Sequence, residues 1–322
     1  MDALGIPANI IGNTPKLLFH TVFAGMSLSG TPYSQGSLKN WIVDFSDSTD
    51  STTGYDIDAD LKTLWGSNTQ IGIQNIPQSN LAADGSDFAT YFAPSLATNQ
   101  LTLQCSARHS TGSGTGNPQC TLMVSRTAAQ AAANDINELC VMLYAKLPAG
   151  LDLQAGNTAT GKFFEVGFEI KSGGYGGASG VGDIRYKLEV LGNNGSNEWA
   201  ATVDNEANGR GTIPSVESAL TQYYRNFSGV APTLNTWTKC YVYFNRSKGR
   251  VIMAVEPDGG VFSVIGDASA PDFPTLNYTL YGHERLPITR MFLGLNYTSA
   301  TLPAATLIKE VQIWDKMPIE LV

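Results

Sequence analysis

Two stretches near the middle of the chain alternate apolar and polar residues with a period of two. Residues 162–171 and residues 184–191 both carry a large apolar side chain at every second position. Because successive side chains on a β-strand point to opposite faces, each stretch predicts a strand with one apolar and one charged face. The apolar positions are Phe164, Val166, Phe168 and Ile170 in the first stretch and Ile184, Tyr186, Leu188 and Val190 in the second.

Short runs of the same kind recur along the chain, separated by turn-forming segments. Residues 256–260 read Glu-Pro-Asp-Gly-Gly between two apolar runs and predict a hairpin. Residues 128–139 are rich in alanine and predict one short helix. Many short strands and a single helix predict an all-β fold, a two-sheet antiparallel sandwich. The other predicted strands are residues 17–23, 41–45, 70–73, 101–105, 121–125, 237–244, 250–255, 261–265, 291–295 and 307–314.

The chain shows no internal repeat and no long linker, so residues 37–322 are predicted to form one sandwich domain. Residues 1–36 carry one strand-like run before a stretch rich in Gly, Ser and Pro, and are predicted to be an N-terminal arm. We expect this arm to pair with the sheet or with a neighbouring subunit. The partners expected on this ground are copies of the chain, as a homo-oligomer, or other proteins of a particle.

Charged residues make up only 15% of the chain, below the usual quarter, and Gly, Ser, Thr and Asn take their place. This composition is common in secreted glycan binders and in proteins of virion surfaces. The net charge of −8 argues against nucleic-acid binding, which needs a basic surface. The apolar runs are too short for a membrane span, and residues 1–25 do not read as a signal peptide. We expect a location on a virion or an extracellular surface, reached by lysis or after removal of a signal.

The cysteines predict no zinc site, because none of the four shows CxxC spacing and the chain has three histidines. Cys140 and Cys240 lie in strand-like segments and are predicted to be buried thiols. Cys105 and Cys120 bracket a loop, and both a disulfide and free thiols stay open there.

The order of several segments points to a family. The segments are residues 101–105, 144–150, 237–244, 250–255, 291–296 and 308–314. Their order resembles that of concanavalin A-like jelly rolls, in particular laminarinase-type β-glucanases and jelly-roll polysaccharide lyases. The resemblance covers roughly residues 95–316. It implies a jelly-roll form of the sandwich and a polysaccharide or cell-surface glycan as partner.

The β-glucanases carry Glu-x-Asp-x-Glu on the strand that here contains Glu165, Gly167 and Glu169. The resemblance implies Glu165 as nucleophile and Glu169 as general acid/base, with Gly167 in place of the middle Asp. Retaining hydrolysis needs carboxyl groups about 5 Å apart, whereas positions i and i+4 on a strand lie about 13 Å apart. Without the middle carboxylate we expect an inert site, with these charges forming cross-strand ion pairs on a solvated face. The residues of that face are Glu165, Glu169, Lys171, Arg185, Lys187 and Glu189.

A jelly-roll lyase would need a Tyr or His base beside an Arg or Asn that neutralises a uronate carboxylate. Three local groupings contain such residues, although each could equally pack and cap a loop. They are Tyr223, Tyr224 and Arg225; Tyr281, His283, Arg285 and Arg290; and Arg108 with His109. The candidate ligand-binding residues are Arg185 and Lys187 of the charged strand face, all three residues of the first grouping, and Tyr281, His283 and Arg285 of the second.

Residues 56–60 resemble the start of a calcium loop, but Leu61 replaces the turn glycine and Ser67 replaces the closing glutamate. We therefore expect no metal ligand set and no cofactor, with calcium bound through backbone carbonyls left open.

Two functions follow from the sequence. The first is a non-catalytic glycan-binding or structural jelly-roll protein of a virus or phage particle, whether in the capsid, in the tail or in receptor binding. The alternative is a polysaccharide-cleaving enzyme, either a β-glucan hydrolase or a uronate lyase. A purely architectural role without any ligand is a third interpretation.

Overall fold

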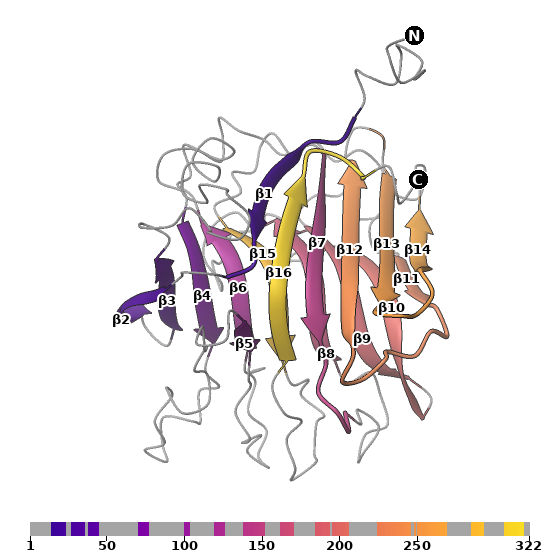
Figure 1. Ribbon diagram of the computed structural model, residues 1–322, viewed down its shortest axis with the longest axis horizontal. Coiled ribbons are helices and arrows are strands. Elements are labelled where there is room, and N and C mark those ends of the chain that lie inside the picture. The colour runs from indigo at the N-terminus through magenta and orange to yellow at the C-terminus, as the bar shows by residue number, and fades with distance from the viewer. Residues whose placement is uncertain are drawn as a thin grey trace.

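The chain folds into two antiparallel β-sheets that lie face to face in the computed structural model (Figure 1). The sandwich predicted from the sequence is therefore confirmed. The structure describes residues 14–23, 27–35, 38–44, 70–76, 100–103, 119–125, 138–151, 162–170, 184–193, 195–205, 224–245, 248, 250–268, 285–292 and 306–318.

The first sheet, called sheet A here, runs in the order β1-β16-β7-β12-β13-β14, with β5 also paired to β16. Its middle strands β7 and β12 are paired along their whole length, from Trp237 opposite Lys146 to Asn245 opposite Glu138. The strands of sheet A are β1 (Leu17–Thr21), β5 (Leu101–Leu103), β7 (Glu138–Lys146), β12 (Trp237–Asn245), β13 (Arg250–Pro257), β14 (Ser263–Ala268) and β16 (Thr306–Trp314).

The second sheet, sheet B, has nine strands in the order β11-β10-β9-β8-β15-β6-β4-β3-β2. The strand with the predicted catalytic motif, β8, lies inside this sheet between β9 and β15. The strands of sheet B are β2 (Ser27–Gln35), β3 (Leu38–Asp44), β4 (Gln70–Ile76), β6 (Gln119–Ser125), β8 (Lys162–Ile170), β9 (Ile184–Asn193), β10 (Ser196–Asn205), β11 (Tyr224–Phe227) and β15 (Arg285–Phe292).

Apolar side chains at alternate strand positions fill the space between the sheets, as the period-two pattern predicts. The ring of Tyr186 on β9 stacks on the ring of Phe244 on β12, with centroids 4.8 Å apart and planes inclined by 7°. This contact joins the two sheets directly. The fully buried core residues around it include Val141, Leu143, Phe164, Val166, Leu188, Val190, Trp199 and Val242.

The sequence prediction missed strands β2 and β10 and assigned the first residues of β7 to a helix. Residues 138 and 139 were assigned to the end of a helix, but they begin β7, because Leu139 is buried in the core opposite Phe244. The rest of that predicted helix lies outside the described residues. Strand β10 was not among the predicted strands, although it buries Trp199, Ala200 and Ala201.

The buried-thiol prediction is confirmed for two cysteines. Cys140 and Cys240 are fully buried free thiols on neighbouring strands of sheet A. Burial removes water from each sulfur and raises the pKa of both thiols, so neither is a nucleophile near neutral pH. Cys105 lies outside the described residues, so its relation to Cys120 remains a prediction.

The N-terminal run of residues 17–21 forms β1 at one edge of sheet A, where it pairs with β16 (Figure 1). The backbone amide of Lys16 donates a hydrogen bond to the Asp315 side chain at 2.7 Å. The backbone amide of Asp315 in turn donates to the Lys16 carbonyl at 3.0 Å. The assembly role of residues 1–36 remains a prediction.

Candidate functional site

The predicted catalytic strand β8 stands beside the charged strand β9. In the cross-strand register Glu165 lies opposite Glu189, Gly167 opposite Lys187, and Glu169 opposite Arg185. On its other side β8 pairs with β15, where Glu165 lies opposite Arg290. The register therefore aligns Arg290, Glu165 and Glu189 in one row across three strands of sheet B.

Gly167 is the position at which β8 differs from the Glu-x-Asp-x-Glu strand of the β-glucanases. Its φ angle is +143°, and a Cβ atom built there would lie 1.9 Å from the backbone oxygen of Tyr186. Real Cβ atoms do not approach a backbone oxygen so closely, so only glycine suits this backbone. The middle Asp of the glucanase motif therefore has no place at position 167 unless the backbone moves.

The neighbouring charges of β9 are buried, which corrects the prediction of a solvated face for Lys187 and Glu189. Their exposed fractions are 3% and 0%. Glu189 accepts a hydrogen bond of 2.5 Å from the Thr202 hydroxyl, and its carboxylate lies 3.7 Å from the Lys187 ammonium group. A buried carboxylate needs such partners, because leaving water is costly for an unpaired charge. These three residues form a structural polar cluster beside Gly167.

We expect Thr202→Val to lower the free energy of unfolding by roughly 2 kcal/mol, because it removes a hydrogen bond to a buried charge while keeping the side-chain shape. Thr238→Val is the matched control, since the buried Thr238 hydroxyl donates only a 3.4 Å bond to the neutral Thr236 carbonyl. Urea denaturation of both variants measures the difference. Equal losses in the two variants would contradict a special role for the Glu189 contact.

The other candidate ligand residues are only partly brought together. Arg225 on β11 lies opposite Thr202, which lies opposite Lys187, so these residues share a row with Gly167. Tyr224 lies opposite Val203 in the next register position. Arg285 is on β15 opposite Ser125, apart from that row. Tyr223, Tyr281, His283, Arg108, His109 and Lys171 lie outside the described residues, as do Cys105 and residues 56–60.

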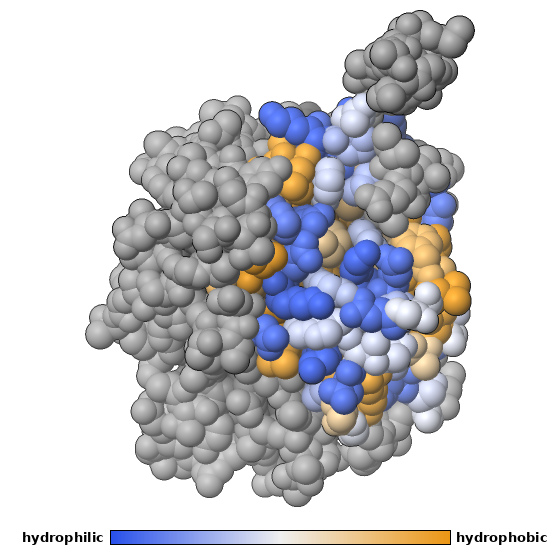
Figure 2. Space-filling view, in the orientation of Figure 1, coloured by the Kyte–Doolittle hydropathy of each residue, from blue (hydrophilic) through white to orange (hydrophobic). Residues whose placement is uncertain are grey.

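A second group of side chains, not predicted from the sequence, lies on the outer face of sheet A. Tyr144 on β7 and Trp237 on β12 are both partly buried, and their ring centroids are 5.8 Å apart with planes inclined by 47°. Figure 2 shows hydrophilic residues over the middle of this face and a hydrophobic strip at the β14 edge, where Val261, Phe262 and Val264 are exposed. These two aromatic residues and the two lysines near them, Lys146 and Lys309, are called the aromatic–lysine cluster below.

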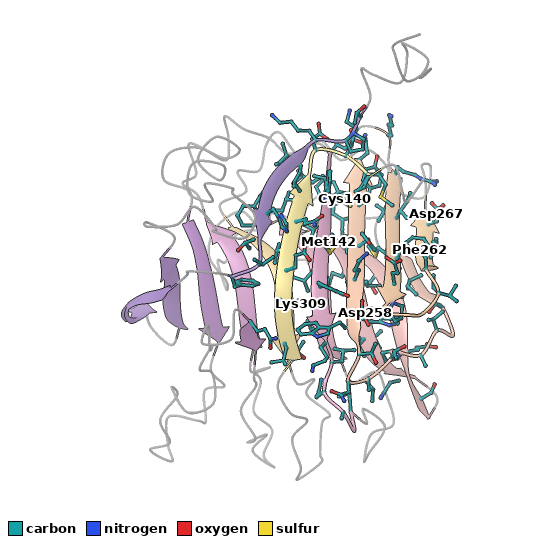
Figure 3. All side chains as sticks on the ribbon, in the orientation of Figure 1. Cys140, Met142, Asp258, Phe262, Asp267 and Lys309 are labelled. Carbon is teal, nitrogen blue, oxygen red and sulfur yellow. The ribbon has the colours of Figure 1, made fainter. Side chains whose placement is uncertain are left out.

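Two ammonium groups complete this cluster. The Lys309 nitrogen lies 3.8 Å from the ring centroid of Tyr144 and 4.6 Å from that of Trp237. The Lys146 nitrogen lies 5.4 Å from the Trp237 ring. Both positions are within the range of cation–π attraction. Figure 3 shows Lys309 and Asp258 at the same level of sheet A, on opposite sides of β7.

Local backbone features position these groups. The register between β16 and β7 shifts between Ile308 and Glu310, so Lys309 is the extra residue of a β-bulge. On the other side, the Asp258 backbone amide donates to the Trp237 carbonyl at 2.8 Å, which fixes the β13–β14 hairpin beside the indole. The Tyr144 hydroxyl donates to the Asp258 carboxylate. The bulge explains why strict alternation along residues 307–314 could not reveal the cluster.

Next to the cluster a chain of hydrogen bonds runs along β16. Trp314 Nε1 donates to Gln312 Oε1 at 3.0 Å, and Gln312 Nε2 donates to Glu310 Oε1 at 2.7 Å. His20 Nε2 on β1 lies 2.7 Å from the same oxygen of Glu310. The hydrogen bond from His20, helped by that from Gln312, lowers the pKa of Glu310 below its ordinary value, against an opposing effect of burial.

This lowered pKa predicts a pH dependence of stability. The contribution of Glu310 is present above its ordinary pKa of 4.5 and is lost as the pH falls through the lowered pKa of the folded state. As the pH is lowered below 4.5, we expect the free energy of unfolding to decrease less steeply in Glu310→Gln than in the wild type. His20→Ala should flatten the profile in the same way, because it removes the donor. Parallel profiles for all three proteins would contradict the assignment.

Another tyrosine of this face, Tyr243, donates from its hydroxyl to Glu138 at 2.7 Å. Burial, with the hydrogen bond and the negative charge of Glu138, raises its pKa, so it cannot act as a base near neutral pH. Among the described residues, no group of three or more His, Cys, Asp or Glu side chains could hold a metal ion. No helix within the described ranges is long and apolar enough to cross a membrane.

No protein-family model and no curated protein matches the sequence. Among solved structures, the chain is similar to an endo-1,3-β-glucanase from Streptomyces sioyaensis, with 14% identity over 67% of this chain and 76% of the other, at a TM-score of 0.39. It is similar to a β-1,3-glucanase from Mycobacterium marinum, with 13% identity over 93% and 99% of the chains and a TM-score of 0.39. A legume lectin-like domain from Entamoeba histolytica matches with 9% identity over 61% and 78%, at a TM-score of 0.35. Two of these three proteins are β-glucanases, a group that the sequence resemblance named.

Proposed function

We propose that this protein is a non-catalytic glycan-binding sandwich protein that serves as a surface component of a virus or phage particle. The observation that carries the glycan-binding part is the aromatic–lysine cluster on the outer face of sheet A. Aromatic rings stack on the C–H faces of sugars, and neighbouring charged groups bind sugar oxygens. Trp237 and Tyr144 provide such rings, and Asp258 and the two lysines provide the polar groups.

The absence of catalysis is supported by Gly167. In the glucanase motif the residue at this position is a carboxylate that tunes the two acids flanking it, and here the backbone admits no side chain. In the adjoining strand, Glu189 pairs with Lys187 and accepts a hydrogen bond from Thr202 inside the protein. Buried and paired in this way, they serve to stabilise the fold rather than to meet a substrate.

The particle location is supported by composition. Charged residues are scarce at 15%, and Gly, Ser, Thr and Asn are abundant, as is common in virion surface proteins. Proteins of particles act as multimers, and residues 1–36 are the part of the chain that we assign to contacts with other subunits.

Size-exclusion chromatography of the full chain and of a chain lacking residues 1–13 tests this assignment, since the shorter chain should lose assembly while its sheets stay intact.

A polysaccharide-cleaving enzyme is the second candidate function, and one observation favours it. Glu165 and Glu189 lie directly opposite each other in register, and such positions are about 5 Å apart at Cβ. This separation is much shorter than the distance of about 13 Å between positions i and i+4, such as Glu165 and Glu169, on one strand. Incubation with β-glucans and with uronate polymers separates the candidates. New reducing ends or unsaturated uronate, lost in Glu165→Gln, would replace the proposed function by an enzymatic one.

The glycan-binding proposal predicts a large effect of Trp237→Ala on affinity. Loss of one stacking ring should weaken glycan binding by at least about tenfold, which corresponds to about 1.4 kcal/mol. Binding to a glycan array followed by calorimetric titration measures it. Phe262→Ala is the matched control, since Phe262 is an exposed aromatic residue that contacts Tyr241 near the β14 edge, away from Lys309 (Figure 3). A blank array would exclude glycan binding, and equal losses in both variants would exclude the cluster as its site.

A further inference from the structure

Resting on the proposed function, we infer that the aromatic–lysine cluster recognises acidic glycans, specifically polysaccharides that contain uronate carboxylates. The starting observation is the pairing of basic side chains on sheets A and B. Lys239 pairs with Glu256 at 3.2 Å, Arg250 with Asp267 at 2.7 Å, and Lys187 with Glu189 at 3.7 Å. Among the described residues, neither Lys146 nor Lys309 forms an ion pair with a carboxylate.

These two lysines are close to the same ring. Lys146, the last residue of the central strand β7, lies opposite both Trp237 and Leu307 in the register. Lys309 reaches the same indole from the bulge on the neighbouring strand β16. Two ammonium groups therefore lie near one partly buried indole ring. Their mutual repulsion is relieved when an anion lies between them.

The geometry favours an anionic over a neutral sugar. In the free protein the Lys309 ammonium group lies over the rings of Tyr144 and Trp237, where a sugar would have to stack. A neutral sugar must displace that ammonium group without compensation. A uronate instead draws it into a charge-assisted hydrogen bond with its carboxylate and leaves the ring faces for its C–H groups. This exchange of partners favours uronate polysaccharides as the class of ligand.

The surroundings make the interaction selective. The whole chain carries a net charge of −8, so anions are repelled at long range and only a ligand that contacts the lysines directly is retained. Asp258, bonded to Tyr144, adds a negative group at the border of the cluster. A uronate polymer suits this arrangement because its carboxylates are spaced apart by hydroxyl-rich rings. A densely charged polyanion would also place negative charges next to the carboxylates of Asp258 and Glu256, which repel them.

The test is calorimetric titration of the full chain with polygalacturonate, alginate, a neutral β-1,3-glucan and polyglutamate. We expect the two uronate polymers to bind more tightly than the neutral glucan, with an affinity that falls as salt is raised. Lys309→Met and Lys146→Met should each weaken uronate binding at least about fivefold, and the double variant more than about tenfold. Lys239→Met is the matched control on the same face, because Lys239 already has Glu256 as partner, and it should stay within about twofold.

Each outcome decides between the proposals. Binding of neutral glucan that equals uronate binding and is unchanged in the lysine variants would overturn acidic specificity while keeping the glycan-binding function. Equal binding of polyglutamate would overturn it too, because the cluster would then be a general anion site. Binding of no polymer at all would overturn the proposed function itself. Unfolding curves of the variants, expected to match the wild type, exclude loss of folding as the cause.

Discussion

Gly167→Ala is expected to destabilise the protein by more than about 3 kcal/mol, enough to leave much of it unfolded or insoluble. The added methyl group would lie 1.9 Å from the carbonyl oxygen of Tyr186, and φ is +143°. Relief requires separating β8 from β9, which breaks the ladder that positions Lys187 and Glu189. The measurement is the midpoint of urea denaturation, with soluble yield as a second readout.

Gly150→Ala is the matched control for this prediction. Gly150 also has a positive φ, +72°, but an added Cβ would meet no atom within 4 Å. Its cost should be limited to the conformational strain of an L-residue in the left-handed region, roughly 1–2 kcal/mol. If both substitutions cost the same, the close approach of Tyr186 has no energetic consequence. Gly167→Asp should be at least as damaging as Gly167→Ala, so restoring the glucanase motif by one substitution should not create an enzyme.

Phe244→Ala is the second substitution with a large expected effect. Phe244 is 1% exposed and stacks on Tyr186 across the interface between the sheets. Truncation of a buried Phe to Ala removes its apolar burial and leaves a cavity, at a cost of about 3–5 kcal/mol. The free energy of unfolding from denaturation, followed by tryptophan fluorescence, gives the value.

Phe262→Ala serves as the control here as well, since Phe262 is 36% exposed at the edge of sheet A and loses little on truncation. We expect its cost to be below about 1 kcal/mol. A small loss for Phe244→Ala would mean that the two sheets do not pack through the Tyr186–Phe244 contact. The sandwich arrangement would then need revision.

Local sequence signals were sufficient for most strands. The period-two pattern predicted β8 and β9 to within two residues, because burial of one face forces alternation. Strand β10 was not predicted, although the sequence contains a signal for it. Asn193 pairs with Ser196, and the two residues between them in the sequence read Asn-Gly, which is a strong sequence signal for a hairpin turn. The polar start of β10 concealed the buried Trp199.

The sequence by itself determined that this chain is an antiparallel β-sandwich, that Cys140 and Cys240 are buried, and that β8 lacks the middle carboxylate. These properties depend on residue type and on spacing along one strand. Only the tertiary structure decided that Glu189 is opposite Glu165, that Lys187 is buried, and that Lys309 reaches Trp237. Strand register brings Glu189 beside Glu165, and a bulge brings Lys309 to Trp237, which is more than 70 positions earlier; neither leaves a periodic trace in the sequence.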